Sequence, residues 1–254
     1  MTSMQFMTNR WRPIRALAPV ALVLLASCAG RRPAINGPLL SPYAEPTTWA
    51  VAPLMNESGV STLDTLAVAD VIAHEVAKIH GIDALPVQRV LDGMRSLDIG
   101  SIDSPATVRS LARLIGADGL IVGTVTAYDP YNPPILGMTL QLYAPDTAPP
   151  ADDVIDRIGT AASDTMLHGF GGADAPVSSA SVVLDASDNG VRLDLERFAR
   201  GRTEMDSALN WKRYLVVMDL YTQYVADRLL RDLLREERVR GNQRLAAGNQ
   251  RPGP

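Results

Sequence analysis

The chain has little cysteine and histidine, with one Cys and three His in 254 residues. A single cysteine cannot form an intramolecular disulfide, so no disulfide framework supports the fold. The usual zinc spacings of Cys and His are also missing. The net charge of −4 argues against a nucleic-acid-binding protein, because phosphate binding needs clustered Lys and Arg. A content of 46% hydrophobic and 20% charged residues is typical of a globular protein and excludes disorder of the whole chain.

Long hydrophobic runs are also lacking, and the clearest one is the eleven-residue run Ala16–Ala26. At about 1.5 Å per residue it covers roughly half of a bilayer core of about 30 Å, so it is too short for a permanent membrane span. Arg10, Arg12 and Arg15 precede it, and no acidic residue occurs before Glu45. This order of a positive start, a short apolar centre and small residues is typical of a secretory signal, here residues 1–27.

The signal ends in Leu25-Ala26-Ser27-Cys28, which resembles the lipobox of bacterial lipoproteins. The resemblance implies cleavage between Ser27 and Cys28, diacylglycerol in thioether linkage on Cys28, and usually an N-acyl chain such as palmitate on the new amino group. Two or more acyl chains give stable membrane anchoring. Ala29 follows the cysteine, and in the sorting rule of enteric bacteria this residue favours the outer membrane. No other cofactor is expected.

The residues after Cys28 are rich in proline and glycine, which predicts a flexible tether over residues 28–48. A folded domain is expected over residues 49–240, followed by a disordered tail over residues 241–254. Within the domain the pattern fails between Pro145 and Pro176, where the sequence is acidic and glycine-rich. This stretch is expected to be an irregular surface insert.

Capping signals and apolar faces predict three helices in the first half of the domain. The clearest has Pro at its first position, after Ser104 as N-cap, and stops at Gly116. Another is capped by Ser61, with Asp64 three residues later, and a third follows a short strand near Ala84–Val87. The apolar faces, in chain order, are Leu66, Ala69, Ala73 and Val76; Val90, Leu91, Met94 and Leu97; and Val108, Leu111, Ala112 and Ile115.

Strand signals surround these helices. A buried first strand is expected within Trp49–Ser58, and residues 118–131 and 135–144 are expected to form an antiparallel hairpin. Ser181–Ser187 is expected to be the third antiparallel strand. The order of elements predicts right-handed crossovers first and antiparallel pairing later. The predicted fold class is therefore α/β (α+β), with a mixed sheet of about five strands packed with helices.

Two further helices are predicted near the carboxyl end. The first covers about residues 190–200 and buries Val191, Leu195 and Phe198. The second covers about residues 206–240, far longer than an average helix, and is expected to pack across the domain and then project. Its apolar residues are Tyr214, Val217, Met218, Tyr221, Val225, Leu229, Leu230, Leu233 and Leu234.

Two motifs in the first half of the domain carry a resemblance. A first strand ends in a polar turn at Asn56–Ser58, and a Gly-Ala-Asp stretch at Gly116–Gly123 leads into a later strand. Over about Trp49–Tyr143 the chain resembles the lipoprotein-associated α/β domain shared by the TolB amino-terminal domain, CsgG and LpoB. That resemblance implies scaffolding, activation or secretion, and it brings no shared catalytic residue.

The sequence offers weak candidates for chemistry. His74 is expected to point away from the apolar face of its helix, His80 to lie at the helix end, and structural roles are favoured for these and for His168. Gly169–Gly172 lacks the Lys and Ser or Thr of a phosphate loop. Asp152 with Asp153 is more easily explained as a solvated pair than as a general acid and base. The prediction is a protein that is not an enzyme.

Two features are candidates for partner binding. The proline-rich turn carries Tyr128 and Tyr131, and exposed aromatic residues are frequent interface anchors. The alternative is that one tyrosine packs inward while the prolines shape the turn. On the last helix a face carries Arg228, Arg231, Arg235 and Arg238. With acidic residues nearby, an ordinary solvated, ion-paired surface is the favoured interpretation of this face.

The functional hypothesis is a non-catalytic, lipid-anchored binding or assembly module of the bacterial envelope, at the outer membrane and facing the periplasm. Its expected partners are the membrane, through the anchor, and an envelope protein or the cell wall. An alternative is a subunit of an oligomeric CsgG-like secretion apparatus. A less favoured alternative is a periplasmic hydrolase with His168 and Asp152 in its site.

Overall fold

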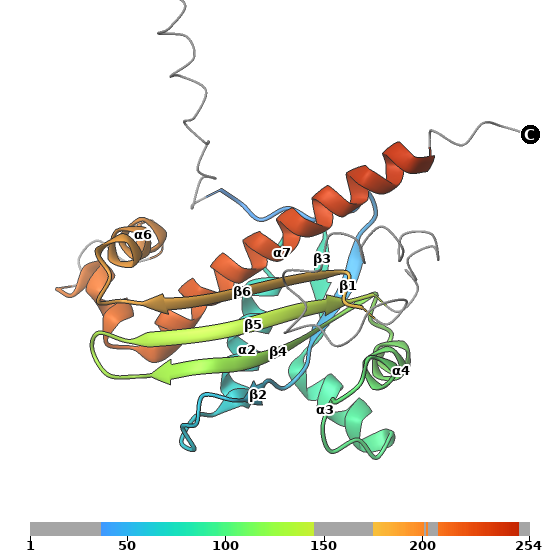
Figure 1. Cartoon of the computed structure of the whole chain (residues 1–254), viewed down its shortest axis with the longest axis horizontal. Helices are drawn as coiled ribbons and strands as arrows, with labels where there is room; N and C mark the ends of the chain where they lie inside the picture. The colour runs from blue at the N-terminus through green and yellow to red at the C-terminus, as the bar shows by residue number, and fades with distance from the viewer. Residues whose placement is uncertain (1–36, 145–174, 201, 203–207, 249–254) are drawn as a thin grey trace, which may run out of the picture. The chain divides into compact units, whose positions relative to one another are not determined.

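A six-stranded mixed sheet forms the centre of the computed structural model (Figure 1). The structure describes residues 37–144, 175–200, 202 and 208–248, which all belong to one unit, Asn36–Pro254. The strands are β1 (Thr47–Val51), β2 (Met55–Asn56), β3 (Ile82–Ala84), β4 (Gly119–Asp129), β5 (Ile135–Tyr143) and β6 (Ser178–Asp185). The order is β3-β1-β4-β5-β6, with β2 paired to β4.

The sheet changes character along this order. β1 runs parallel to β3 and β4, whereas β4, β5 and β6 are antiparallel neighbours. The predicted mixed α/β sheet and its late antiparallel group are therefore confirmed. The strand count is six and not about five because β2 pairs through only two residues, too few for a sequence signal.

Helices cover both faces of the sheet. They are α2 (Thr65–Val76), α3 (Val87–Ser96), α4 (Pro105–Ile115), α6 (Asn189–Ala199), the 3-10 helix η3 (Asn210–Leu215) and α7 (Met218–Gly248). α2 and α7 pack against each other and against β1, β5 and β6. α3 and α4 lie on the other face, over β1, β4 and the end of β5 (Figure 1).

The predicted alternation of β5 is confirmed. Leu136, Met138, Leu140 and Leu142 are all fully buried on the face towards α7. Burying each side chain contributes about 1.5–3 kcal/mol of transfer free energy. The residues between them, such as Thr139 and Gln141, remain partly exposed, so β5 has one core face and one accessible face.

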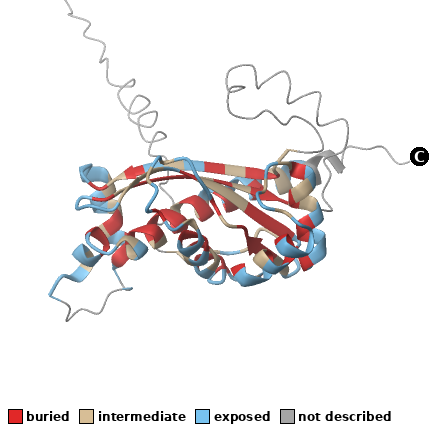
Figure 2. Cartoon of the chain, turned by 90° about the horizontal axis from the view of Figure 1, so that it is seen from below, coloured by how far each residue is buried: buried red, intermediate tan, exposed pale blue. Residues whose placement is uncertain are grey.

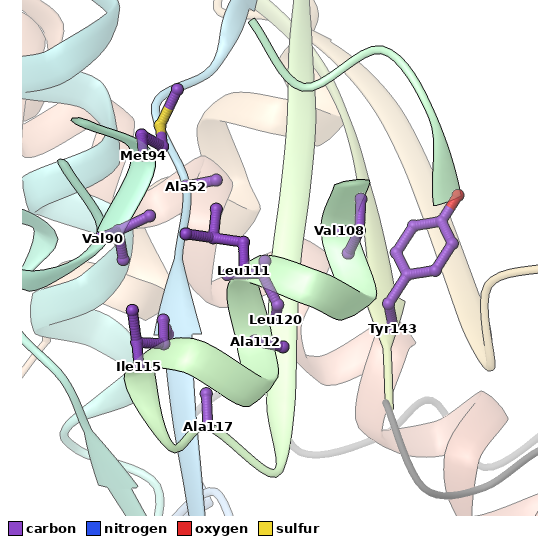
Figure 3. Packing of buried hydrophobic residues seen from close by; sticks show 11 residues of the cluster. Ala52, Val90, Met94, Val108, Leu111, Ala112, Ile115, Ala117, Leu120 and Tyr143 are labelled. Atoms are coloured by element: carbon purple, nitrogen blue, oxygen red, sulfur yellow. The ribbon is translucent and has the colours of Figure 1, made fainter. Parts of the chain in front are cut away.

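A second core cluster fixes α3 and α4 to the opposite face. It joins Val90, Val108 and Leu111 of the helices to Leu120 of β4 and Tyr143 of β5 (Figure 3). The two helices approach closely at the only position in α3 without a side chain, Gly93, where a Cβ would meet Ile115 at 2.7 Å.

The capping of α4 agrees in detail with its sequence signals. The Ser104 hydroxyl accepts a hydrogen bond from the Thr107 amide at 3.2 Å, and Pro105 occupies the first helical position. Gly116 ends the helix with a positive φ of 74°, a conformation that favours glycine.

The cap predicted for α2 is wrong by three residues. Asp64, and not Ser61, is the N-cap, and its carboxylate accepts from the amides of Leu66 and Ala67, each at 3.0 Å. The buried face also differs from the predicted one, because Leu66 is exposed and the buried hydrophobic residues of α2 are Val68, Ala69, Ile72 and Val76.

The predicted tether is ordered over its last residues. A parallel bridge joins Leu40 to His80, and the Ser41 amide donates to the His80 carbonyl oxygen at 2.9 Å. Tyr43 packs edge-on against Trp49, with ring centroids 6.3 Å apart. The tether prediction is therefore wrong for residues 37–48, because a tyrosine and the edge strand β3 give this stretch partners. β3 itself begins two residues before the predicted strand, and its last residue is Ala84.

The predicted long C-terminal helix is confirmed, but its bounds differ from the predicted ones at both ends. The chain first forms η3, which buries Tyr214 and Leu215 but exposes Val216 and Val217, and α7 begins only at Met218. Tyr214 packs edge-on against Phe198, which holds this turn in place. At the other end α7 runs to Gly248, because Gln, Arg, Leu and Ala within residues 243–247 are good helix formers, so residues 241–248 are not a disordered tail.

Several expectations lie outside the described residues. They are the signal sequence with Cys28, most of the insert between Pro145 and Pro176, and the candidate residues Asp152, Asp153, His168 and Gly169–Gly172. For these the predictions from sequence stand as predictions.

Candidate functional site

The antiparallel strands have an accessible face that we call the open face. It lies on the side of β4, β5 and β6 away from α7 and beyond the end of α4 (Figure 1 and Figure 2). The strand register sets its residues in three rows: Thr124, Thr139 and Ser181; Ala127, Gly137 and Val183; and Asp129, Ile135 and Asp185. With about 3.4 Å per residue and 4.8 Å between strands, the rows cover roughly 14 Å by 10 Å.

A groove with a volume of about 430 Å³ adjoins the open face. Thr124 and Thr139 belong to both. The other walls are apolar residues from the β1–β2 connection and α3, including Leu54 and Met94, and the α3–α4 connection with Asp103. The volume lies within the usual range for ligand pockets, about 300–1,000 Å³.

Polar groups of the groove are partly engaged already. The Tyr143 hydroxyl donates to the Gln141 side-chain oxygen at 3.2 Å, and the hydroxyls of Thr139 and Ser181 lie 2.9 Å apart. Asp103 is the one carboxylate among the described lining residues. This arrangement suits contact with a neutral or cationic group, and it places no second acid or base beside Asp103.

A bulge shapes the middle row of the open face. The β4–β5 register shifts between Val125 and Ala127, so an extra residue, Thr126, enters the strand. A Cβ on Gly137 would lie 2.8 Å from the Thr126 hydroxyl oxygen and 3.0 Å from a Val183 methyl carbon. The side chains of Thr126, Ala127 and Val183 therefore fill the space above Gly137.

The charge on the open face has one sign. Among the described residues that form its three rows or line the groove, none is Lys, Arg or His. The acidic residues in this set are Asp103, Asp129 and Asp185. Hydrogen bonds from Ser187 lower the pKa of Asp185, so this carboxylate is charged at neutral pH.

The two tyrosines of the turn differ in exposure. This agrees with the alternative in which one tyrosine packs inward. Tyr128 faces the helical side, where burial, and then the charge of Asp219, raises its pKa. Tyr131 is 79% exposed beyond the last row of the open face, and its amide donates to the Asp129 carboxylate at 3.0 Å. Tyr131 is therefore the more exposed of the two, and Tyr128 is partly buried.

The arginines of α7 are largely occupied by ion pairs. Arg231 binds the buried Asp227 through two nitrogens, at 2.7 and 3.0 Å, and Arg235 pairs with Asp232 at 2.8 Å. Arg228 lies 3.9 Å from Asp194. The exposed Arg238 completes the four, and they do not form one free basic surface.

Two acidic residues of α7 are buried, which the expectation of a solvated, ion-paired face did not include. Asp227 is 1% exposed and also meets Arg202 at 3.4 Å. Glu237, 2% exposed, accepts from the Tyr43 hydroxyl at 2.8 Å and pairs with Arg240. A charged residue within an apolar stripe, here Asp227 between Tyr224 and Leu230, is the signal that identifies such a group.

The remaining candidate features in the described part of the chain are the histidines, clusters of metal ligands and membrane-spanning helices. His74 is exposed, as predicted, and His80 contacts residues 39 and 41 through its backbone. Within the described ranges no three His, Cys, Asp or Glu residues gather to hold a metal ion. Among the helices described, none has the length and apolar character to cross a membrane.

Comparisons with known proteins identify structures but no family model. No family model and no curated protein sequence matches the chain. The LpoB C-terminal domain from Salmonella enterica is 15% identical with a TM-score of 0.35, over 41% of this chain and 76% of that one. Lipoprotein GNA1162 from Neisseria meningitidis is also 15% identical, with a TM-score of 0.38, over 55% of this chain and 81% of that one.

The hypothetical protein CT253 from Chlamydia trachomatis is 11% identical with a TM-score of 0.37, and the match covers 76% of this chain and 95% of that one. Because all three TM-scores lie below 0.5, the likeness carries no argument about function. The structures that this chain is similar to nevertheless include LpoB, which the sequence resemblance names, and a lipoprotein.

Proposed function

We propose that this protein is a lipid-anchored binding or assembly module of the bacterial cell envelope, held at the outer membrane and facing the periplasm. One observation carries the proposal: the sequence Leu25-Ala26-Ser27-Cys28 directly after an arginine-rich start and a short apolar run. Lipid on Cys28 would tether a folded unit whose described part begins nine residues later, at Gly37.

The described unit supports a binding role over a catalytic one. Its groove offers one carboxylate, Asp103, and the first two rows of its open face consist of Thr, Ser, Ala, Gly and Val residues. Because these residues are small, a partner can approach the backbone of such a surface closely and form hydrogen bonds with its hydroxyl groups. General acid–base catalysis needs positioned titratable groups, and the open face presents its aspartates at the edges, without a base beside them.

The anchor is tested with Cys28→Ala in cells labelled with palmitate. The parent chain should incorporate label and fractionate with outer membranes, whereas the variant should lose both. Ser27→Ala is the matched control, because a small residue before the cysteine preserves the lipobox. If Cys28→Ala still takes up label and stays with membranes, the anchor proposal is wrong.

The binding role is tested separately by crosslinking and mass spectrometry on intact cells that express the full chain. A specific envelope protein or cell-wall fragment should be recovered above background. Recovery of nothing above background would contradict a binding or assembly role, whatever the outcome of the labelling experiment.

A further inference from the structure

The open face holds exposed apolar groups that nothing in the described structure covers. Val183 is 61% exposed in its middle row, and Tyr131 is 79% exposed beyond its last row. The groove at the other end has apolar walls that include Leu54, Met94 and Val122. Exposed aromatic residues on a rigid support are frequent anchors of protein interfaces. The prolines on both sides of Tyr131 provide such a support.

The charges around these apolar groups are all negative. Asp103 lies at the groove, and Asp129 and Asp185 flank Ile135 at the opposite end. No Lys, Arg or His occurs among the described residues of the three rows and the groove. Complementary charges at the rim of an interface raise the association rate and exclude wrong partners. An occupant of this face therefore needs lysine or arginine around an apolar centre.

We infer that the open face docks a protein partner whose contacting surface has apolar side chains ringed by Lys or Arg, with one apolar side chain entering the groove. The inference rests on the proposed function, since it names the partner class for that module. An anionic lipid surface has the wrong charge for this face. In a second copy the α7 residues Arg231 and Arg235 are already paired, and the crosslinking experiment distinguishes such a copy from another protein.

The experiment places a photo-crosslinking amino acid, p-benzoylphenylalanine, at position 131 or 183 of the full chain in intact cells. Leu114, 50% exposed on the helical surface of α4, is the control position. Positions 131 and 183 should crosslink one protein that position 114 does not. Mass spectrometry should locate the crosslinked peptides on a part of that protein rich in Lys or Arg.

Charge reversal then tests the chemistry of the contact. Asp129→Lys with Asp185→Lys should lower the crosslink yield at position 131 at least about fivefold. The matched control, Asp70→Lys with Asp83→Lys, has the same net charge on exposed sites away from the face and should leave the yield unchanged. Circular dichroism melts of both variants, each equal to the parent, establish that folding is unaffected.

Each other result overturns the inference. Crosslinks to lipid, crosslinks between two copies of this chain, no product beyond that of position 114, or a yield unmoved by charge reversal would each do so. The two proposals fail separately. Loss of the crosslink with labelled Cys28 refutes the docking surface alone, whereas a charge-sensitive crosslink with unlabelled Cys28 refutes the anchor alone.

Discussion

Tyr43 connects the amino-terminal stretch to the last helix, and Tyr43→Phe tests what that connection contributes. The Tyr43 hydroxyl donates to Glu237 at 2.8 Å, and Glu237 is 2% exposed. Burial, and then the charge of Glu237, raises the pKa of Tyr43, so the phenol stays protonated at all physiological pH values. The substitution removes one hydrogen bond and keeps the ring against Trp49.

The expected loss follows from the charge of the acceptor. A hydrogen bond to a charged group contributes about 1.5–3 kcal/mol to stability. Because Arg240 still pairs with Glu237 in the variant, the carboxylate is not left alone, and the lower end of the range applies. We therefore expect Tyr43→Phe to reduce the free energy of unfolding by about 1.5 kcal/mol.

Two measurements distinguish a global from a local effect. Urea unfolding of the whole chain reports the global free energy. Hydrogen exchange of the Ser41 and His80 amides, which bond to the carbonyls of His80 and Leu39, reports local release of the stretch. Tyr131→Phe, at an exposed site, is the control and should change neither. If Tyr43→Phe also leaves the free energy of unfolding and the amide exchange unchanged, the hydrogen bond between Tyr43 and Glu237 does not stabilise the fold, and the reasoning is refuted.

Three further predictions concern the core and the open face. Asp227→Asn should lower the free energy of unfolding in urea by about 3 kcal/mol, because it leaves Arg202 and Arg231 facing a buried neutral group. The control Asp232→Asn, at an exposed ion pair, should lower it by less than about 1 kcal/mol. Gly137→Ala should cost about 1–3 kcal/mol through its clash with Thr126, and adding Thr126→Ala should restore part of the loss. Burial raises the pKa of Tyr224 to about 12, above the value of about 10 for an unfolded chain. The stability that this tyrosine contributes is therefore complete below about pH 10 and is lost as the pH rises towards 12. Tyr224→Phe should make the fall of the urea midpoint over this pH range shallower.

The elements that sequence predicts well are those whose signals are local. Ser104, Pro105 and Gly116 bound α4 as expected, because a cap, a proline and a left-handed glycine each act on the backbone beside them. The alternation of β5 is equally local, since every second side chain meets the same helix layer. The α/β class follows from the order of such elements.

The elements that sequence misses depend on partners far along the chain. Tyr43 finds Glu237 at a separation of 194 residues, and no periodicity near Tyr43 indicates this contact. α7 starts late because Tyr214 packs on Phe198 of another helix. For the same reason the sequence pattern does not indicate the open face. Its residues Thr124, Thr139 and Ser181 become neighbours only through strand pairing.

The ordering of residues 39–43 also changes how far the unit could stand from a bilayer under the proposed anchor. A tether from Cys28 to Thr48 has twenty residue steps and spans at most about 70 Å, whereas one from Cys28 to Leu40 has twelve and spans at most about 40 Å. Tyr43 sits at Glu237, while the Tyr128 end of the open face sits near Asp219, eighteen residues or about 27 Å back along α7. Under the proposed anchor, the surface of a partner that contacts Tyr131 must therefore lie within about 70 Å of the membrane. A larger distance would require the contact between Tyr43 and Glu237 to open.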